Sequence, residues 1–186
     1  MALVRSAIFG EAYRDLWRRA LSPQVDAACR VASIDPWADY EMRQTAAGQT
    51  VYGNIAAFQA LRAQQAAKGK SLTLAASLGG WTKSTHFSGC VATAAGRSSV
   101  VQTSLELLER SGFDGIDVDW EYPVCCGLDS NEVAPDDWAK FGGAHFRTLQ
   151  SLPLLWAHHG RPALFRFQVP APPTGAARRD GCRLPH

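Results

Sequence analysis

Three carboxylates stand two residues apart near the middle of the chain. The segment 113–123 reads FDGIDVDWEYP, and an extended strand would point Asp117, Asp119 and Glu121 to the same side. Backbones two residues apart on one face lie about 7 Å from each other, so their charges repel by roughly 2 kcal/mol at an effective dielectric constant of about 20. The three groups therefore do not ionise independently, and the apparent pKa of Glu121 is expected to be raised. A carboxyl group that stays protonated near neutral pH can serve as a general acid.

Two other interpretations of this acidic pattern have to be weighed. Aspartates at such a spacing also occur on surface strands, and they hold magnesium or calcium in metal sites. A metal-dependent phosphotransfer site is disfavoured because no glycine-rich phosphate-binding loop accompanies the aspartates. The five cysteines show no paired metal-ligand spacing. Neither a metal nor a cofactor is therefore expected.

Helices and strands alternate around the acidic segment. Apolar residues recur at helical spacing from Asn54, a predicted N-cap, to a stop at Lys68 and Gly69. The other predicted elements are, in order, a buried strand at 71–78, a helix with a capping box at Ser99 and Gln102 and a C-cap at Gly112, the acidic strand at 113–121, and a helix from Asp136 to Pro153. Such alternation predicts parallel βα units in an α/β fold.

The acidic strand favours a (β/α)8 barrel over a doubly wound sheet. Its second face would carry Ile116, Val118 and Trp120. A row of carboxylates is costly to bury in an ordinary sheet face, whereas a barrel strand can aim it into the barrel mouth and pack the apolar row on helices. Barrel enzymes place their chemistry at the carboxyl ends of the strands, and Glu121 ends this one.

Two motifs resemble those of glycoside hydrolase family 18, which includes bacterial chitinases. The family's DxxDxDxE signature is matched by Asp114, Asp117, Asp119 and Glu121. Upstream, its SxGGW motif is matched by Ser77, Gly79, Gly80 and Trp81. The resemblance implies a (β/α)8 TIM barrel that hydrolyses the β-1,4-N-acetylglucosamine linkages of chitin with retention, by a substrate-assisted mechanism.

The resemblance also implies a role for each motif residue. Glu121 would be the general acid and base, Asp119 would hold the acetamido N–H of the substrate, and Asp117 would share a proton with Asp119. The remaining residues fall into a sugar-binding set, Trp81, Tyr122 and Gly80, and a structural set, Asp114, Ser77 and Gly79.

The likeness covers only part of the chain. It runs over residues 35–152, whereas a complete barrel needs roughly 250 residues. Residues 1–34 are unassigned and show no recognisable first strand, and the Pro/Arg-rich tail at 153–186 is expected to be disordered or out of register with the family. We therefore expect an incomplete barrel holding strands of the N-terminal half, with weak or no activity alone. The alternative is a non-catalytic chitin-binding or non-functional fragment.

Composition excludes several kinds of partner. The formal charge of +2 is too small to imply nucleic acid, and no apolar run approaches the roughly 18 residues of a membrane span. Chitin or chitooligosaccharides are the partners that the resemblance implies.

The resemblance also implies an extracellular location, although no signal peptide is recognisable. The odd number of cysteines predicts unpaired thiols, and His158 and His159 are expected to be exposed tail residues.

Overall fold

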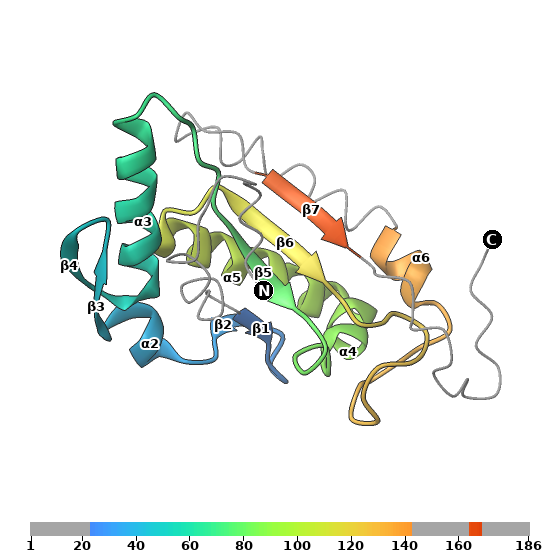
Figure 1. Ribbon diagram of the computed structural model, residues 1–186. Helices are drawn as coiled ribbons and strands as arrows, with labels where there is room; N and C mark the ends of the chain where they lie inside the picture. The colour runs from blue at the N-terminus through green and yellow to red at the C-terminus, as the bar shows by residue number, and fades with distance from the viewer. Residues whose placement is uncertain (1–22, 143–163, 169–186) are drawn as a thin grey trace.

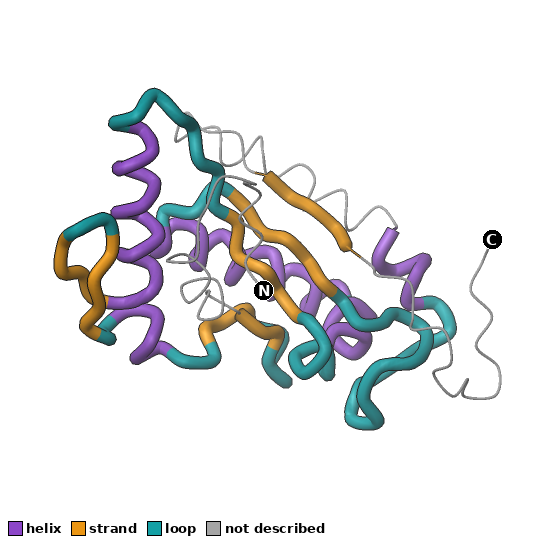
Figure 2. Tube along the Cα trace, viewed as in Figure 1, coloured by secondary structure: helices purple, strands orange, loops and turns teal. Residues whose placement is uncertain are grey.

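The computed structural model describes residues 23–142 and 164–168 (Figure 1). Its central sheet has three parallel strands, β5 (Ala75–Gly79), β6 (Gly115–Asp119) and β7 (Leu164–Gln168), in the order β5-β6-β7. The carboxyl ends of parallel strands lie at one edge of a sheet, and the loops after β5 and β6 leave from that edge (Figure 2). The predicted parallel βα arrangement is therefore confirmed.

Strands β5 and β6 are buried except for Asp119 at the end of β6. All five residues of β5 are buried, and Ile116, Val118 and Trp120 belong to the hydrophobic core. The indole ring of Trp120 stacks on the ring of Phe87 in α4 (Phe87–Ala92), with their centroids 5.2 Å apart. The apolar row of the acidic strand thus faces the helices, as predicted.

Helix α5 (Ala94–Ser111) lies along the sheet and leads into β6 (Figure 1). The Oγ1 atom of Thr93 accepts a hydrogen bond from the N–H of Gly96 at 2.9 Å, so Thr93 is the N-cap. The predicted capping box at Ser99 and Gln102 is therefore wrong, because the helix already begins at Ala94. Its end is as predicted: Gly112 takes the left-handed conformation, with φ 65°, that glycine adopts without steric cost.

Helix α3 (Gly53–Ala66) matches the predicted helix, but Asn54 is not its N-cap. Asn54 lies inside the first turn, and its Nδ2 atom donates a hydrogen bond to Oδ1 of the buried Asp39 at 2.9 Å. The N-cap prediction failed because the Asn54 side chain, which would otherwise cap the helix, is bound to Asp39 instead. The elements preceding α3 are α2 (Pro36–Tyr40), β3 (Arg43–Ala46) and β4 (Gln49–Tyr52), and the two strands pair antiparallel.

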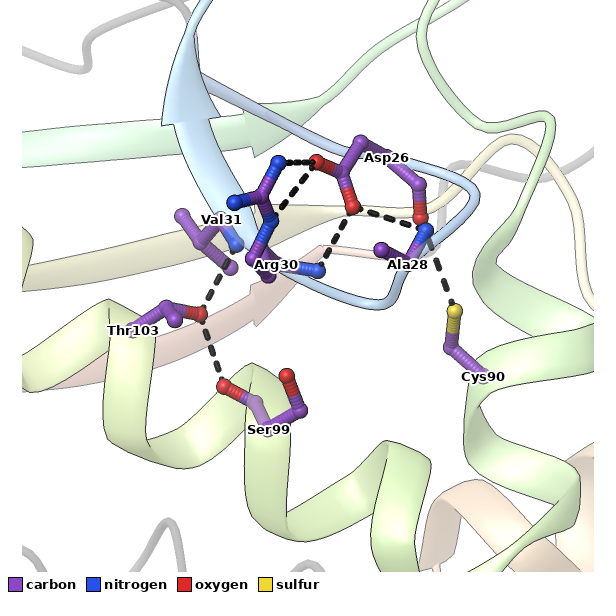
Figure 3. Close-up of polar contacts among 7 residues, drawn as sticks. All are labelled: Asp26, Ala28, Arg30, Val31, Cys90, Ser99 and Thr103. Atoms are coloured by element: carbon purple, nitrogen blue, oxygen red, sulfur yellow. Dashed lines mark hydrogen bonds and ion pairs between the residues drawn. The ribbon is translucent and has the colours of Figure 1, made fainter.

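A hairpin of β1 (Pro23–Val25) and β2 (Val31–Ser33) precedes these elements. In its turn, Asp26 Oδ1 accepts the N–H groups of Ala28 and Arg30, both at 2.9 Å. The hairpin is joined to α5 because the N–H of Val31 donates to Thr103 Oγ1 at 2.8 Å (Figure 3). Residues 1–34, which were left unassigned because no first strand was recognisable in the sequence, therefore contain two short strands.

Two disulfides contradict the prediction of unpaired thiols. Cys29 in the hairpin turn is bonded to Cys90 in α4, and Cys125 is bonded to its neighbour Cys126. The fifth cysteine, Cys182, lies outside the described residues. An odd count leaves one cysteine over but does not exclude pairing among the others, and the fold brings Cys29 to Cys90 across 61 residues of sequence.

One strand lies within the C-terminal tail, which was expected to be disordered or out of register with the family. Strand β7 belongs to residues 153–186 and pairs parallel with β6. The other tail residues, including His158 and His159, lie outside the described residues, as does the predicted helix beyond α6 (Asp137–Gly142). Within the described part, the three parallel strands do not form a closed barrel, and no helix is long and apolar enough to cross a membrane.

Candidate active site

The two sequence motifs meet at the carboxyl ends of β5 and β6. The register aligns Ser77 with Asp117 and Gly79 with Asp119, so the SxGGW and DxxDxDxE motifs lie side by side. The N–H of Gly80 donates to the carbonyl oxygen of Asp119 at 2.6 Å. A Cβ atom on Gly79 would collide with the same carbonyl, and its φ of 105° disfavours any side chain. Only glycine permits this close approach of the two strand ends.

The carboxylate row passes from the interior of the sheet toward solvent. Asp117 is 1% exposed, whereas Asp119 and Glu121 are partly buried. Burial raises the pKa of Asp119 above its usual value. Burial also raises the pKa of Glu121, and the neighbouring charge of Asp119 raises it further, while a hydrogen bond with Tyr122 opposes the rise. The direction predicted for Glu121 is therefore found, with desolvation rather than charge repulsion as the larger cause.

Two aromatic side chains, Trp81 and Tyr122, meet where the chain leaves β5 and β6. Trp81, directly after the two glycines, is 44% exposed, and its ring meets the buried ring of Tyr122 edge to face with centroids 6.5 Å apart. An exposed indole beside a proton donor can cover the apolar face of a sugar ring. Two of the three residues predicted to bind sugar, Trp81 and Tyr122, are thus in contact with each other.

Asp114, the first residue of the signature, lies at the opposite end of β6. Its Oδ2 atom forms an ion pair with Arg62 of α3 at 2.7 Å and accepts the N–H of Leu74 at 2.8 Å. These contacts join α3, the start of β5 and the start of β6. The geometry agrees with a structural role for Asp114 and separates it from the other three acids.

Several residues that organise the loops of the site belong to neither sequence motif. Asp137 is buried, with Oδ1 accepting from the hydroxyl of Ser88 at 2.7 Å and Oδ2 accepting the N–H groups of Val124 and Ala134 at 3.1 and 2.8 Å. Ser84 and Asn131 hold the main chain of Glu121, as described below. In the sequence, only Asp137 stood out, because it lies where a helix was predicted to begin. Ser84 and Asn131 gave no such signal, since their contacts with Glu121 form across 37 and 10 residues.

No cluster of three metal-ligating side chains occurs among residues 23–142 and 164–168. One carboxylate oxygen at the end of β6, Asp119 Oδ2, lies beside Gly80, 3.8 Å from the place where a Cβ atom on that glycine would be. The arrangement of the carboxylates is suited to holding and transferring a proton.

Comparison with known proteins identifies the family. A family model described as "Glycosyl hydrolases family 18" matches residues 21–150. The chain belongs to this family. Chitinase A1 of Niallia circulans is 34% identical over 154 residues, which cover 81% of this chain and 21% of that protein. The match begins at residue 21, before the boundary at 35 that the motifs suggested.

Solved structures of the family resemble the chain over most of its length. Chitinase ChiA74 from Bacillus thuringiensis has a TM-score of 0.57 and 25% identity, covering 75% of this chain and 23% of that one. The Group IV chitinase of Ostrinia furnacalis in complex with allosamidin has a TM-score of 0.56 and 27% identity, covering 78% and 33%. The chain spans about a fifth of the length of curated relatives such as Chitinase A1 of Niallia circulans and Endochitinase 1 of Metarhizium robertsii.

Proposed function

We propose that this chain carries the catalytic strand of a chitinase and hydrolyses β-1,4-N-acetylglucosamine linkages with retention. One observation carries the proposal: Glu121 ends a carboxylate row at the carboxyl edge of the sheet, where burial and the charge of Asp119 raise its pKa. A carboxyl group with a raised pKa keeps its proton to a higher pH than an ordinary glutamate does, and it can donate that proton to a glycosidic oxygen. The chitinase names of the family relatives support the substrate class.

In the proposed mechanism, Glu121 protonates the leaving oxygen while the 2-acetamido oxygen of the substrate attacks the anomeric carbon. Asp119 accepts a hydrogen bond from the acetamido N–H, which orients that oxygen and stabilises the positive charge of the cyclic intermediate. Asp117, buried behind it, shares a proton with Asp119. Glu121 then takes a proton from a water molecule. The oxygen of that water attacks the anomeric carbon and opens the cyclic intermediate, so the product keeps the anomeric configuration of the substrate. Trp81 and Tyr122 contact the sugar beside the bond that breaks.

A second candidate is a chitin-binding chain that does not hydrolyse its ligand. It is favoured by the three-stranded sheet of the described part, which lines only a segment of a barrel mouth. The exposed face of Trp81 would support sugar binding even without efficient proton transfer. Both candidates predict that the chain binds chitooligosaccharides, and only the first predicts that it hydrolyses them.

The disulfide between Cys29 and Cys90 supports an extracellular location for the proposed enzyme. Structural disulfides persist in oxidising compartments and are rare in the cytosol of mesophiles. An extracellular chitinase would also meet its polymeric substrate directly.

The deciding experiment measures release of a fluorescent leaving group from a chitobiose glycoside by the purified chain. Glu121→Gln should abolish release while leaving allosamidin or chitooligosaccharide binding in place, because the amide keeps the shape but cannot donate the proton. Glu106→Gln on the exposed face of α5 is the matched control and should leave the rate unchanged. Measurable turnover at equal rates by the parent chain and Glu121→Gln would refute the assignment of the acid. Binding without turnover in the parent chain would favour the second candidate.

A further inference from the structure

Two side chains from different loops hold the main chain of Glu121. The N–H of Glu121 donates to Oγ of Ser84 at 3.0 Å, and its carbonyl oxygen accepts from Nδ2 of Asn131 at 2.8 Å. Ser84 lies in the loop after β5, whereas Asn131 lies in the loop between β6 and α6. Both backbone polar groups of the proposed acid are therefore bound by side chains outside its own strand.

The two side chains are themselves fixed. Ser84 is 0% exposed, and its hydroxyl donates to the carbonyl oxygen of Gly80 at 2.9 Å. Gly80 in turn donates its N–H to the carbonyl of Asp119, so Ser84 connects the backbones of Asp119 and Glu121 through one residue. This chain of hydrogen bonds sets the position of Glu121 relative to Asp119.

Asn131 is equally constrained from the other side. It is buried, and its N–H donates to the carbonyl oxygen of Leu128 at 3.0 Å. A Cβ atom on Gly127, which has φ 75°, would lie 2.6 Å from both Asn131 Nδ2 and Glu121 O, so the loop leaves no room for a side chain there. The next residue, Glu132, donates its N–H to the carbonyl of Thr85 at 2.9 Å and thereby ties this loop to the one that carries Ser84.

We propose that Ser84 and Asn131 are positioning residues for the proton donor, which hold the backbone of Glu121 so that its carboxyl group stays in line with Asp119. The proposal rests on the function proposed above. A proton donor has to stay within hydrogen-bond reach of the oxygen that it protonates, and a misplacement of about 1 Å can lower a rate on the order of 100-fold. Substrate need not touch either residue for this effect.

The same hydrogen bonds also stabilise the loops, so the test needs a control that loses equivalent bonds elsewhere. Ser111 supplies it at the opposite end of β6. Ser111 is 3% exposed, its hydroxyl accepts the N–H of Phe113 at 3.2 Å, and it donates to the carbonyl of Leu108 at 3.4 Å. Ser84→Ala and Ser111→Ala therefore remove the same two kinds of bond, one beside the acid and one far from it.

The experiment measures kcat, KM and thermal stability of the 186-residue chain and its variants with the fluorescent chitobiose glycoside. We expect Ser84→Ala and Asn131→Ala each to lower kcat by about 100-fold with KM within about twofold. Ser111→Ala should leave kcat within about threefold at a comparable loss of stability. Equal effects of Ser84→Ala and Ser111→Ala on kcat, or a kcat of Ser84→Ala within about threefold of the parent, would overturn the proposal.

A second measurement is independent of turnover and separates this proposal from the proposed function. Titration of ¹³C-labelled glutamate by NMR reports the protonation of Glu121, whose signal is identified by its loss in Glu121→Gln. If the parent chain shows no hydrolysis, the function fails for this chain while the positioning role is still tested. A titration midpoint that moves in Ser84→Ala and not in Ser111→Ala supports the role. Identical midpoints in all three proteins contradict it.

Discussion

The disulfide between Cys29 and Cys90 is expected to contribute a large share of the stability of this chain. It joins the turn of the β1–β2 hairpin to α4, and its cysteines are 61 residues apart in the sequence. The loop-closure entropy removed from the unfolded chain, 2.1 + 1.5R ln 61, is about 14 cal/mol/K, which corresponds to about 4 kcal/mol at 25 °C. The free energy of unfolding of native proteins is only about 5–15 kcal/mol, so this one disulfide supplies a large fraction of it.

The perturbation is the double variant Cys29→Ala/Cys90→Ala, followed by urea denaturation with tryptophan fluorescence as the readout. At a slope of about 2 kcal/mol per molar urea, the midpoint should fall by about 2 M. The matched control is Cys125→Ala/Cys126→Ala, because these cysteines are adjacent and their bond closes almost no loop. Its loss should be below about 1 kcal/mol. A midpoint change no larger than that of the control would refute the loop-entropy reasoning.

Three further outcomes follow from the geometry of the site. Asp114→Ala should lower the free energy of unfolding by about 2–3 kcal/mol, because it leaves the largely buried Arg62 without this partner. Chitooligosaccharide binding by the folded variant should persist. Unchanged stability with lost binding would instead assign Asp114 to the sugar-binding site. Burial raises the folded-state pKa of Glu121 above its unfolded value, so its contribution to stability falls as pH rises through the raised pKa. Glu121→Gln should therefore raise Tm at pH 7 and not at pH 3, and an equal shift at both pH values would contradict this. EDTA should leave hydrolysis and Tm unchanged, whereas a loss restored by magnesium or calcium would make the carboxylates metal ligands.

The strand that carries the site could be predicted closely because its physics is local. Alternation along Phe113–Glu121 separates the acids from Ile116, Val118 and Trp120. The structure buries that apolar row in the hydrophobic core, where Trp120 stacks on Phe87. The end of α5 at Gly112 could also be predicted from the sequence, since glycine adopts the left-handed conformation at little energetic cost. The start of α5 was misplaced because several residues near Thr93 and Ser99 are competent caps.

Strand β7 was missed for a different reason. Its sequence, LFRFQ, lies in a tail whose proline and arginine content predicts disorder. Its pairing with β6 depends on an edge that β6 offers only in the folded sheet. Composition describes the average of a segment, whereas strand pairing depends on the neighbour that the fold supplies.

The sequence by itself determined which chemistry is available: three carboxylates on one face of a strand, an indole after two glycines, and the family to which both motifs belong. The tertiary structure decided which groups hold that chemistry in place. Ser84 and Asn131 meet Glu121 across 37 and 10 residues, and Cys29 meets Cys90 across 61. Periodicity and capping act within a few residues, so they predict faces and ends of elements. Contacts between loops exist only after β5 and β6 have paired in register, because that pairing is what brings their loops to the same edge of the sheet.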